Sequence, residues 1–402
     1  MNTWVDVPES SDFPVTNLPY GVFRNGNGRR IGVAIGEHVL DLAGAVERGM
    51  LDGPSAMLRT ATLNDFMAAG REQWTRVRDR VSELLTDESC RGSVEPLLVP
   101  QRDVAMCLPF EMADYIDSYS SLDHATNVGK LFRPDAEPLL PNWRHLPVGY
   151  HGRAGTVVVS GTEIVRPAGQ RKAPEAAAPS YGPSNRLDIE AEVGFVVGVP
   201  TALGERVSTA DFAEHVFGVV LLNDWSARDI QAWEYVPLGP FLGKSFATSI
   251  SPWVVPLAAL AGARVPSPVQ DPPPLDYLRD ADPWALDLTL EVTWNGTVVS
   301  RPPFASTYWT PGQQLAHLTV NGASLRTGDL YASGTVSGPG RDQRGSFLEL
   351  SWGGTEPVTL ADGSRRTFLE DGDTVTIRAT APGPDGAAIG FGAVTGTIAL
   401  AR

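Results

Sequence analysis

The chain has 402 residues, of which 42% are hydrophobic and 20% are charged, a balance that excludes a largely disordered protein. Its formal net charge of −15 makes nucleic acid and anionic membranes poor partners, because binding to either needs clustered Lys and Arg. An acidic substrate therefore needs a local cationic pocket.

Two features suggest where the protein works. Cys90 and Cys107 are the only cysteines, so a disulfide scaffold is not expected, and two thiols suit a reducing cytosol. Residues 1–13 lack the apolar stretch of a signal peptide, and the longest apolar run, 216–222, is too short to span a bilayer. We therefore expect a cytoplasmic protein that does not enter a membrane.

The first part of the chain reads as a separate unit. Its short β runs within 31–42 are followed by a helix predicted over 72–85, where five apolar residues share one face. The mixed stretch 88–104 contains Gly and Pro and is the expected boundary. The predicted domains are therefore 1–105 and 106–402. With 41 glycines and 33 prolines, the whole chain favours a turn-rich fold that is mainly β with some α.

A polar and aromatic cluster opens the second domain. Residues 114–124 contain two Tyr, three Asp and His124, and we interpret this unusual composition as a functional loop. A single histidine is more often a structural hydrogen-bonding group than a catalytic base, so both roles stay open for His124.

The segment 188–197 predicts a strand that becomes buried on both faces. Side chains alternate along a strand, so Glu190 and Glu192 point to the same face, about 6.6 Å apart. Burial of two carboxylates needs compensation, which a hard divalent cation with oxygen ligands supplies. The alternative is a half-exposed strand with solvated glutamates.

A second buried strand, predicted over 217–222, ends in Asn223 and Asp224 before a probable helical turn. Asp224 lies where reactive groups often occur, although a helix cap would explain it equally well. Arg228 and Gln231 are three residues apart on that turn and share a face, so both can donate to one substrate oxygen.

Two short motifs in the next segment do not carry the chemistry that they suggest. Residues 239–245 resemble a phosphate-binding loop, but Leu238 occupies the position of the first glycine and Pro240 removes a backbone N–H. Residues 243–247 resemble a nucleophile elbow but end in Ala. Lys244 is either a side chain that reaches solvent or a fixed cation over an active site.

The remaining chain is predicted to form a β meander. The Pro-rich stretch 266–274 reads as a surface loop, and Asn295-Gly296 is typical of a type I′ hairpin turn. The expected strands lie at 285–300, 347–352, 374–379 and 393–399.

Several long motifs together resemble the fumarylacetoacetate hydrolase family almost from end to end. They are residues 17–23, 31–36, 124–129, 146–153, 223–244 and 332–335. The resemblance implies a fumarylacetoacetase-like fold, with a small N-terminal SH3-like barrel and a larger C-terminal mixed β-roll. It also implies a homodimer.

The resemblance further implies a role for each candidate residue. The expected metal ligands for Mg²⁺ or Ca²⁺ are Asp117, Glu190, Glu192 and Asp224, with Lys244, through its backbone or nearby, and Thr248 beside the metal. The expected substrate contacts are Tyr119, Arg133, Tyr150, Gln231, Tyr235 and Thr335. His124 is the expected general base and Glu349, in the strand predicted at 347–352, orients it. Lys244, Gln231 and Arg228 are expected to stabilise an alkoxide.

The implied reaction is metal-dependent hydrolysis of a carbon–carbon bond in 4-fumarylacetoacetate, which gives fumarate and acetoacetate in the last step of tyrosine and phenylalanine catabolism. The alternatives are an acylpyruvate hydrolase or a hydratase of the same superfamily, or a binding protein that kept the fold. The N-terminal domain and the long block 223–244 favour fumarylacetoacetate cleavage. The complete set of base, cation and carboxylates argues against a non-catalytic protein.

Overall fold

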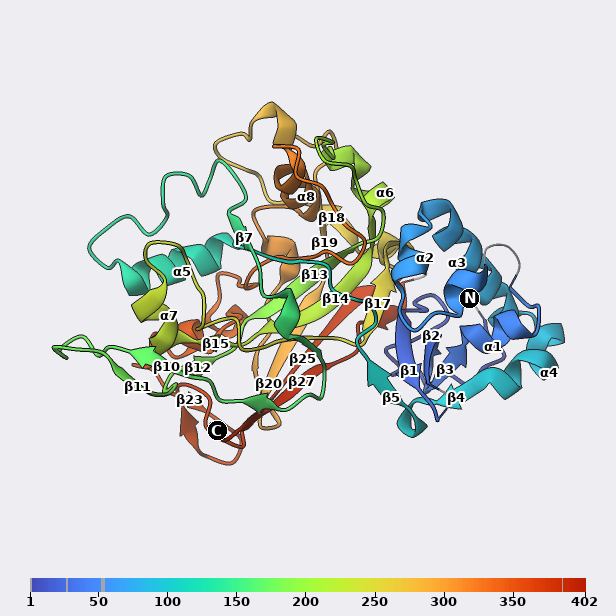
Figure 1. The fold of residues 1–402 in the computed structure, drawn as a ribbon, viewed down its shortest axis with the longest axis horizontal. Helices are drawn as coiled ribbons and strands as arrows, with labels where there is room; N and C mark the ends of the chain where they lie inside the picture. Colours follow the sequence, from blue (N-terminus) through green and yellow to red (C-terminus); the bar gives the residue numbers. More distant parts are fainter. Residues whose placement is uncertain (1, 27, 52–54, 385) are drawn as a thin grey trace.

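The computed structural model describes residues 2–26, 28–51, 55–384 and 386–402. Figure 1 shows a small N-terminal unit beside a larger C-terminal unit, with long strands running through the larger one. The chain is mixed α and β and mostly sheet, as the sequence predicts. Among the described residues, no helix is both long and apolar enough to cross a membrane.

The N-terminal unit consists of short strands covered by helices. Its elements are β1 (Tyr20–Arg24), β2 (Arg29–Ile35), β3 (His38–Asp41), α1 (Leu42–Glu47), α2 (Asn64–Ala68), α3 (Arg71–Thr86), α4 (Arg91–Val94), β4 (Leu98–Pro100) and β5 (Ala105–Cys107). The helix predicted over 72–85 is α3, and its five apolar residues are all buried. The buried face of α3 thus closes the core of this unit.

The small N-terminal β domain is confirmed, but its described strands form no closed barrel. The strands β4, β3, β2 and β1 follow one another in the sheet, and β5 pairs with β1. On the same edge of β1 as β5, the start of β1 pairs with β17 (Trp253–Pro256) of the larger unit, with Tyr20 opposite Val254. Because that edge is already used, β1 cannot close a barrel, and one 13-stranded sheet runs through both units.

The first half of the C-terminal unit supplies the central strands. Its elements are β6 (Tyr115–Ser118), α5 (Leu122–Phe132), β7 (Gly149–His151), β8 (Val157–Val159), β9 (Ile164–Val165), β10 (Ala168–Arg171), β11 (Ser180–Pro183), β12 (Leu187–Asp188), β13 (Ala191–Val197), α6 (Phe212–His215), β14 (Val216–Asp224), β15 (Ser226–Ala227), α7 (Arg228–Glu234), β16 (Thr248–Ile250) and β17. The large sheet continues in the order β17, β14, β13, β22 (Leu330–Ala332), β6, β7. It is mixed, because β22 and β6 are parallel while β13 and β14 are antiparallel.

The second half builds a smaller sheet. Its elements are β18 (Arg264–Pro266), β19 (Trp284–Leu286), β20 (Thr289–Trp294), β21 (Thr297–Ser300), α8 (Pro311–Thr319), β22 (Leu330–Ala332), α9 (Phe347–Leu350), β23 (Val358–Thr359), β24 (Arg365–Arg366), β25 (Thr374–Pro382), β26 (Ala388–Gly390) and β27 (Val394–Ala399). Strands β21, β20, β25, β27 and β9 pair in that order, and this sheet packs against β14. The predicted turn is confirmed, because Asn295 and Gly296 both have positive φ between β20 and β21.

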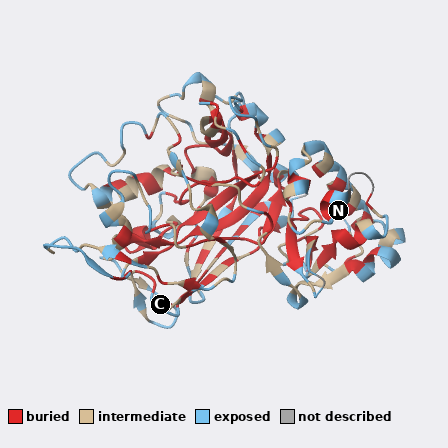
Figure 2. Ribbon diagram, viewed as in Figure 1, coloured by how far each residue is buried: buried red, intermediate tan, exposed pale blue. Residues whose placement is uncertain are grey.

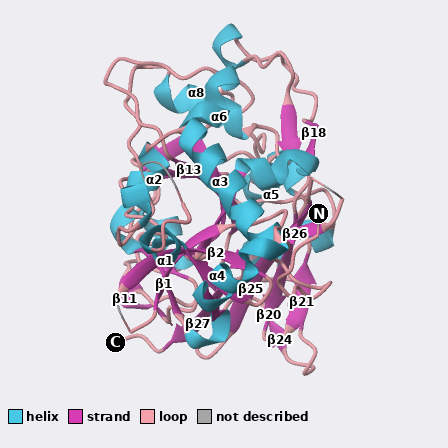
Figure 3. Ribbon diagram, turned by 90° about the vertical axis from the view of Figure 1, so that its right-hand side faces the viewer, coloured by secondary structure: helices cyan, strands magenta, loops and turns pink. Residues whose placement is uncertain are grey.

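Buried residues follow the strands through both units, as the red ribbons in Figure 2 show. One hydrophobic cluster fills the space between the two sheets of the larger unit, and a second joins the N-terminal unit to the far side of the large sheet. Helices α6 and α8 lie together at one end of the molecule, away from the smaller sheet (Figure 3). The strands that carry the candidate site residues are therefore packed into these hydrophobic clusters.

Three local predictions were wrong. Residues 114–124 are not a loop, since they form β6 and the start of α5. The strand predicted over 188–197 is broken at Ile189 and Glu190, between β12 and β13. The strand predicted at 347–352 is the helix α9, because Ser346 caps it by accepting a hydrogen bond from the backbone of Glu349.

Candidate active site

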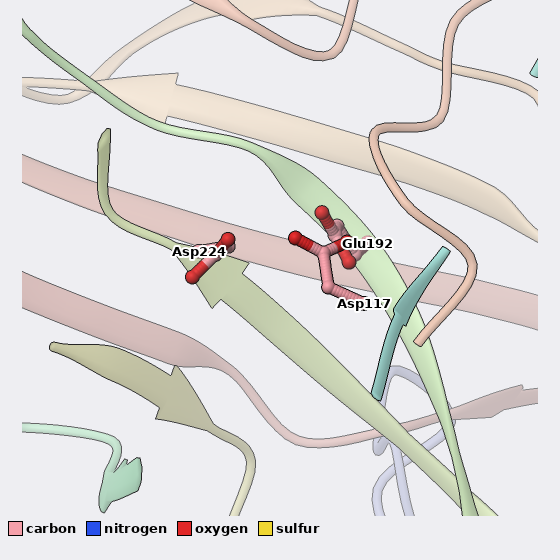
Figure 4. Close-up of side chains that lie close together, drawn as sticks. All are labelled: Asp117, Glu192 and Asp224. Atoms are coloured by element: carbon pink, nitrogen blue, oxygen red, sulfur yellow. The ribbon is translucent and has the colours of Figure 1, made fainter. Parts of the chain in front are cut away.

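Three carboxylates from three strands of the large sheet converge at one point. Asp117 comes from β6, Glu192 from β13 and Asp224 from the end of β14. Their oxygens lie within 4.8 Å of one another, and Figure 4 shows the three side chains turned toward the same space. We name Asp117, Glu192 and Asp224 the carboxylate triad.

Burial and mutual repulsion disfavour the ionised form of two of these carboxylates. Burial raises the pKa of Asp117 to about 6, although Arg153 and Lys244 oppose this shift. Burial also raises the pKa of Glu192 well above its usual value, and the neighbouring carboxylates Asp117, Glu190 and Asp224 add to the effect. Both carboxylate oxygens of Glu192 are buried without a hydrogen-bond partner. Such unpartnered oxygens, beside two further carboxylates, fit a hard divalent cation, so the triad is a possible metal-binding site.

Arg153 neutralises part of this charge, a role that the sequence did not predict. Its guanidinium donates to both oxygens of Asp224 at 2.7 and 2.9 Å and to Asp117 Oδ2 at 2.6 Å. The ring of Tyr115 lies 4.7 Å from the guanidinium carbon and that of Tyr150 lies 5.3 Å away. Burial disfavours the charged guanidinium, but Asp224, Tyr115 and Asp117 outweigh this and raise its pKa.

Lys244 is a fixed, buried cation and not a side chain that reaches solvent. Its Nζ donates to Glu190 and, at 2.7 Å, to Asp224 Oδ2. Thr248 donates to Asp224 Oδ1 at 2.8 Å, so both predicted neighbours of the metal contact this carboxylate. Burial lowers the pKa of Lys244, but Asp224 and Glu190 outweigh it and raise the pKa overall.

Glu190 lies between two cations at the side of the triad. Its Oε1 pairs with Arg228 NH1 at 2.8 Å, and its Oε2 accepts from Lys244. Burial favours the neutral acid, but Lys244 and Arg228 outweigh it and hold the pKa of Glu190 far below its usual value. Glu190 is therefore ionised and close to the triad, although its role as a metal ligand stays a prediction.

His124 and Glu349 form a hydrogen-bonded pair, with 2.7 Å between His124 Nδ1 and Glu349 Oε2. Three further side chains hold the same carboxylate: Asn127 donates to Oε1, and Ser337 and Ser346 donate to Oε2, each at 2.9 Å. Burial opposes ionisation of Glu349, but His124 and these hydrogen bonds lower its pKa overall. The pair is thus a carboxylate with an imidazole held in one orientation.

A cavity of about 310 Å³ joins these parts. His124, Asp117, Arg228 and Lys244 line it. All six predicted substrate contacts also line it: Tyr119, Arg133, Tyr150, Gln231, Tyr235 and Thr335. Glu192, Asp224, Thr248 and Glu349 do not line the cavity and support the residues that do. The structure therefore brings every predicted site residue to one place, while the role of each remains a prediction.

The arrangement can polarise an acidic substrate and deliver a proton acceptor to it. Arg133 and Tyr119 border the cavity on the side of α5, and Lys244 and Arg228 border it from α7 and the segment after it. Lys244 and Arg228 are already ion-paired with Glu190, Asp224 and Asp188. Arg133 forms no ion pair among the described residues, so it is the cation that can bind a carboxylate of an acidic substrate.

The sequence did not predict four supporting residues: Arg153, Asn127, Ser337 and Asp188. Arg153 is the last residue of the family-like run 146–153, and its place in that run was the one available signal. Asn127 lies one turn after His124 on α5, a helix that the sequence did not predict, although Asn127 belongs to the family-like run 124–129. Ser337 and Asp188 reach Glu349 and α9 only through the tertiary fold.

Comparisons with known proteins agree with this geometry. A family model described as "Fumarylacetoacetate (FAA) hydrolase C-terminal" matches residues 115–399, and one described as "Fumarylacetoacetase N-terminal" matches residues 16–109. The chain is 49% identical to the fumarylacetoacetase of Caenorhabditis elegans, with 99% of each chain covered. It is 48% identical to that of Homo sapiens, with 98% of each covered, and 45% identical to that of Arabidopsis thaliana, with 99% of this chain and 98% of the other covered.

The fold also matches solved structures. A fumarylacetoacetate hydrolase from psychrophilic Exiguobacterium antarcticum superposes with a TM-score of 0.57 at 17% identity, covering 96% of this chain and 100% of the other. At this identity the likeness concerns the fold alone.

Proposed function

The chain belongs to the fumarylacetoacetase family, and we propose that it hydrolyses the carbon–carbon bond of 4-fumarylacetoacetate to fumarate and acetoacetate. In this role it acts in the last step of tyrosine and phenylalanine catabolism. The observation that supports the reaction best is the cavity lined by His124, Asp117, Lys244 and Arg228, with Glu349 bonded to His124 and with Glu192 and Asp224 grouped with Asp117 behind the lining.

The carboxylate triad would hold the divalent cation, with Glu190 as a fourth acidic group beside it. We propose Mg²⁺ or Ca²⁺, because an all-oxygen donor set suits hard cations. When bound, such a cation supplies Lewis-acid polarisation of substrate oxygens.

The His124–Glu349 pair supplies the base. Glu349 accepts the Nδ1 proton of His124, which leaves Nε2 free to take a proton from water. The water oxygen then bonds to the ketone carbon on the fumaryl side, and the carbonyl becomes an alkoxide. Collapse of the alkoxide breaks the carbon–carbon bond, releases fumarate, and leaves a carbanion of acetoacetate that takes up a proton.

Three further side chains that line the cavity stabilise the negative charge that develops on the alkoxide. Lys244 and Arg228 are buried cations, and Gln231 is held by a hydrogen bond from Arg228 to its Oε1 at 3.2 Å, which leaves its amide N–H₂ to donate. Preorganised donors of this kind are often worth about 3–4 kcal/mol each. Arg133, at the cavity wall, would pair with a terminal carboxylate of the substrate.

The test is the loss of the β-diketone ultraviolet absorbance of fumarylacetoacetate. We expect rapid loss with purified enzyme, none after chelation, and recovery when Mg²⁺ or Ca²⁺ is added. His124→Ala should abolish turnover while the protein still binds the cation by calorimetry. Turnover of an acylpyruvate instead, by the same folded protein, would assign the cavity to a related hydrolase.

We also propose that the protein is a cytoplasmic homodimer. The segment 233–242, which borders the cavity, exposes six large apolar side chains: Trp233, Tyr235, Val236, Leu238, Phe241 and Leu242. An apolar surface of this kind is typical of a site that contacts another protein. Light scattering after gel filtration should give twice the chain mass, and Leu238→Glu should shift the population toward monomer. A wild-type particle with the mass of one chain would contradict the proposal.

A further inference from the structure

One buried carboxylate lies between helix α9, which carries Glu349, and the guanidinium of Arg228. Asp188 ends β12 and is fully buried. Its Oδ1 accepts hydrogen bonds from the backbone of Ile189 at 2.8 Å and of Phe347 at 2.7 Å. Its Oδ2 accepts from the backbone of Leu348 at 3.1 Å and from Arg228 Nε at 2.8 Å. Asp188 is neither a cavity-lining residue nor a member of the carboxylate triad.

On one side, Asp188 fixes the element that carries Glu349. Helix α9 has four residues, so it depends on groups outside the helix to hold its first backbone N–H groups. Ser346 caps the N–H of Glu349, and Asp188 accepts those of Phe347 and Leu348. The direction in which Glu349 faces His124 therefore depends on Asp188.

On the other side, Asp188 fixes the guanidinium of Arg228. Arg228 uses Nε for Asp188 and NH1 for both Glu190 and Gln231. The guanidinium is planar and rigid, so a buried acceptor at Nε fixes the directions of its other N–H groups. The position of Arg228 at the cavity wall is therefore also set by Asp188.

We propose that Asp188 is a positioning residue that couples the His124–Glu349 pair to the cationic wall formed by Arg228. The proposal deepens the proposed function and rests on it for the catalytic consequence, but the coupling itself is a structural property. If the coupling exists, a change at Arg228 moves Glu349, and so His124, although Arg228 and Glu349 share no hydrogen bond or ion pair among the described residues.

The experiment combines nuclear magnetic resonance and kinetics on the full-length protein. Protein labelled with ¹⁵N-histidine reports the Nδ1–H of His124 through its hydrogen bond to Glu349. The variants are Asp188→Asn, which places an amide donor against Arg228, and Arg228→Lys, which keeps the charge but loses the Nε donor. The control is Asp229→Asn, the next residue of α7, which contacts Ser184 and Asn185 and not α9.

We expect the His124 resonance to move in both Asp188→Asn and Arg228→Lys and to stay in place in Asp229→Asn. We also expect Asp188→Asn to lower kcat by about 100-fold with a smaller change in KM, because catalytic groups misplaced by about 1 Å lose that much. If Asp188→Asn does not fold, Arg228→Lys carries the test alone. An unmoved His124 resonance in Arg228→Lys, or an equal movement in Asp229→Asn, overturns the proposal.

These outcomes are separable from failure of the proposed function. Wild-type enzyme that does not consume fumarylacetoacetate under any cation contradicts the function, whereas the histidine resonance still reports the coupling. If wild-type enzyme turns over fumarylacetoacetate but the His124 resonance does not move in the variants, the coupling alone is contradicted.

Discussion

Arg153 shows how a single residue can make an acidic cluster tolerable. Its φ of 70° lies in the left-handed region, which a non-glycine residue adopts only when its surroundings enforce it. The enforcing contacts are Asp117 and Asp224 at its N–H groups and two tyrosine rings within 5.3 Å of the guanidinium carbon. Backbone strain at this position therefore accompanies charge neutralisation of the triad.

Arg153→Met should make the fold depend on bound cation. Removing one partner of a buried ion pair costs about 3–5 kcal/mol, because the other charge remains unpaired. We expect the chelated variant to melt well below the chelated wild type, and added Mg²⁺ or Ca²⁺ to raise the melting temperature of the variant more than that of wild type. Differential scanning fluorimetry measures both shifts. The exposed Arg59→Met is the control, and equal metal shifts in wild type and Arg153→Met would contradict the role given to Arg153.

Glu349 should make a pH-dependent contribution to stability. The pKa of Glu349 in the folded protein lies below its usual value of 4.5, because His124, Asn127 and Ser346 outweigh burial. Its contribution is therefore complete above about pH 4.5 and is lost as the pH falls through the lower folded pKa. Glu349→Gln should cost about 1.5–3 kcal/mol at neutral pH, as hydrogen bonds to a charged group do. Urea unfolding of both proteins from pH 7 to pH 3 should show this difference shrinking toward low pH, and a constant difference would contradict it.

At the scale of elements, α7 and the segment after it form one unit. The backbone N–H of Ala227 donates to Gly243 O at 2.7 Å, and the N–H of Gly243 donates to Glu234 Oε1 at 2.7 Å. The segment after α7 therefore folds back against the helix, so that Lys244 and Arg228 both reach Glu190. A Cβ on Gly243 would lie 2.7 Å from the backbone N of Gln231, so no larger residue fits without movement.

Gly243→Ala should therefore weaken catalysis by moving the segment away from α7. We expect kcat to fall by at least 10-fold, because Lys244 and Gln231 both shift, while the melting temperature falls by a few degrees as in other overpacked cores. Gly92→Ala is the matched control, since a Cβ there meets no atom within 4 Å. Stopped-flow loss of diketone absorbance measures kcat, and an unchanged kcat in Gly243→Ala would show that the contact is dispensable.

Elements with a strong local pattern could be predicted, and elements defined by tertiary contacts could not. The 16-residue helix α3 and the turn at Asn295-Gly296 follow from spacing and turn chemistry alone. The four-residue helix α9 is too short for a helical period, and its stability depends on Ser346 and on the distant Asp188. The break before β13 likewise places Glu190 between Lys244 and Arg228, partners that no local pattern reveals.

The same distinction applies to the site. Acidic residues at strand ends, together with the family resemblance, predicted the three carboxylates that the structure brings together and the contact of His124 with Glu349, while their roles stay predictions. The supporting residues were missed because they are common types whose meaning lies in their contacts: Arg153, Asn127, Ser337 and Asp188. At the scale of the whole molecule, the prediction of two domains did not foresee that one sheet crosses them, because strand pairing between distant segments leaves no local signal.

Because β1 and β17 share that sheet, the two units should not be independent. A cut after residue 109 leaves β5 whole in the N-terminal unit. Separation of residues 110–402 from that unit exposes the edge of β17 and the apolar residues that pack on the far side of the large sheet. We expect this fragment alone to aggregate or to unfold at much lower urea than the full chain. Co-expression with fragment 1–109 should restore solubility, as the control for the cut itself. A monomeric fragment 110–402 as stable as the full chain would contradict this prediction.

The pairing of β1 with β17 also sets an order of events during synthesis. The ribosome makes Tyr20 long before its partner Val254. At translation rates of about 5–20 residues per second, roughly 230 intervening residues take on the order of 10–50 seconds. For that time the nascent N-terminal strands have an open edge next to a hydrophobic surface, which is the kind of surface that chaperones recognise. Yield of this enzyme in a cell should therefore respond to chaperone capacity and to translation speed, even when the finished protein is stable.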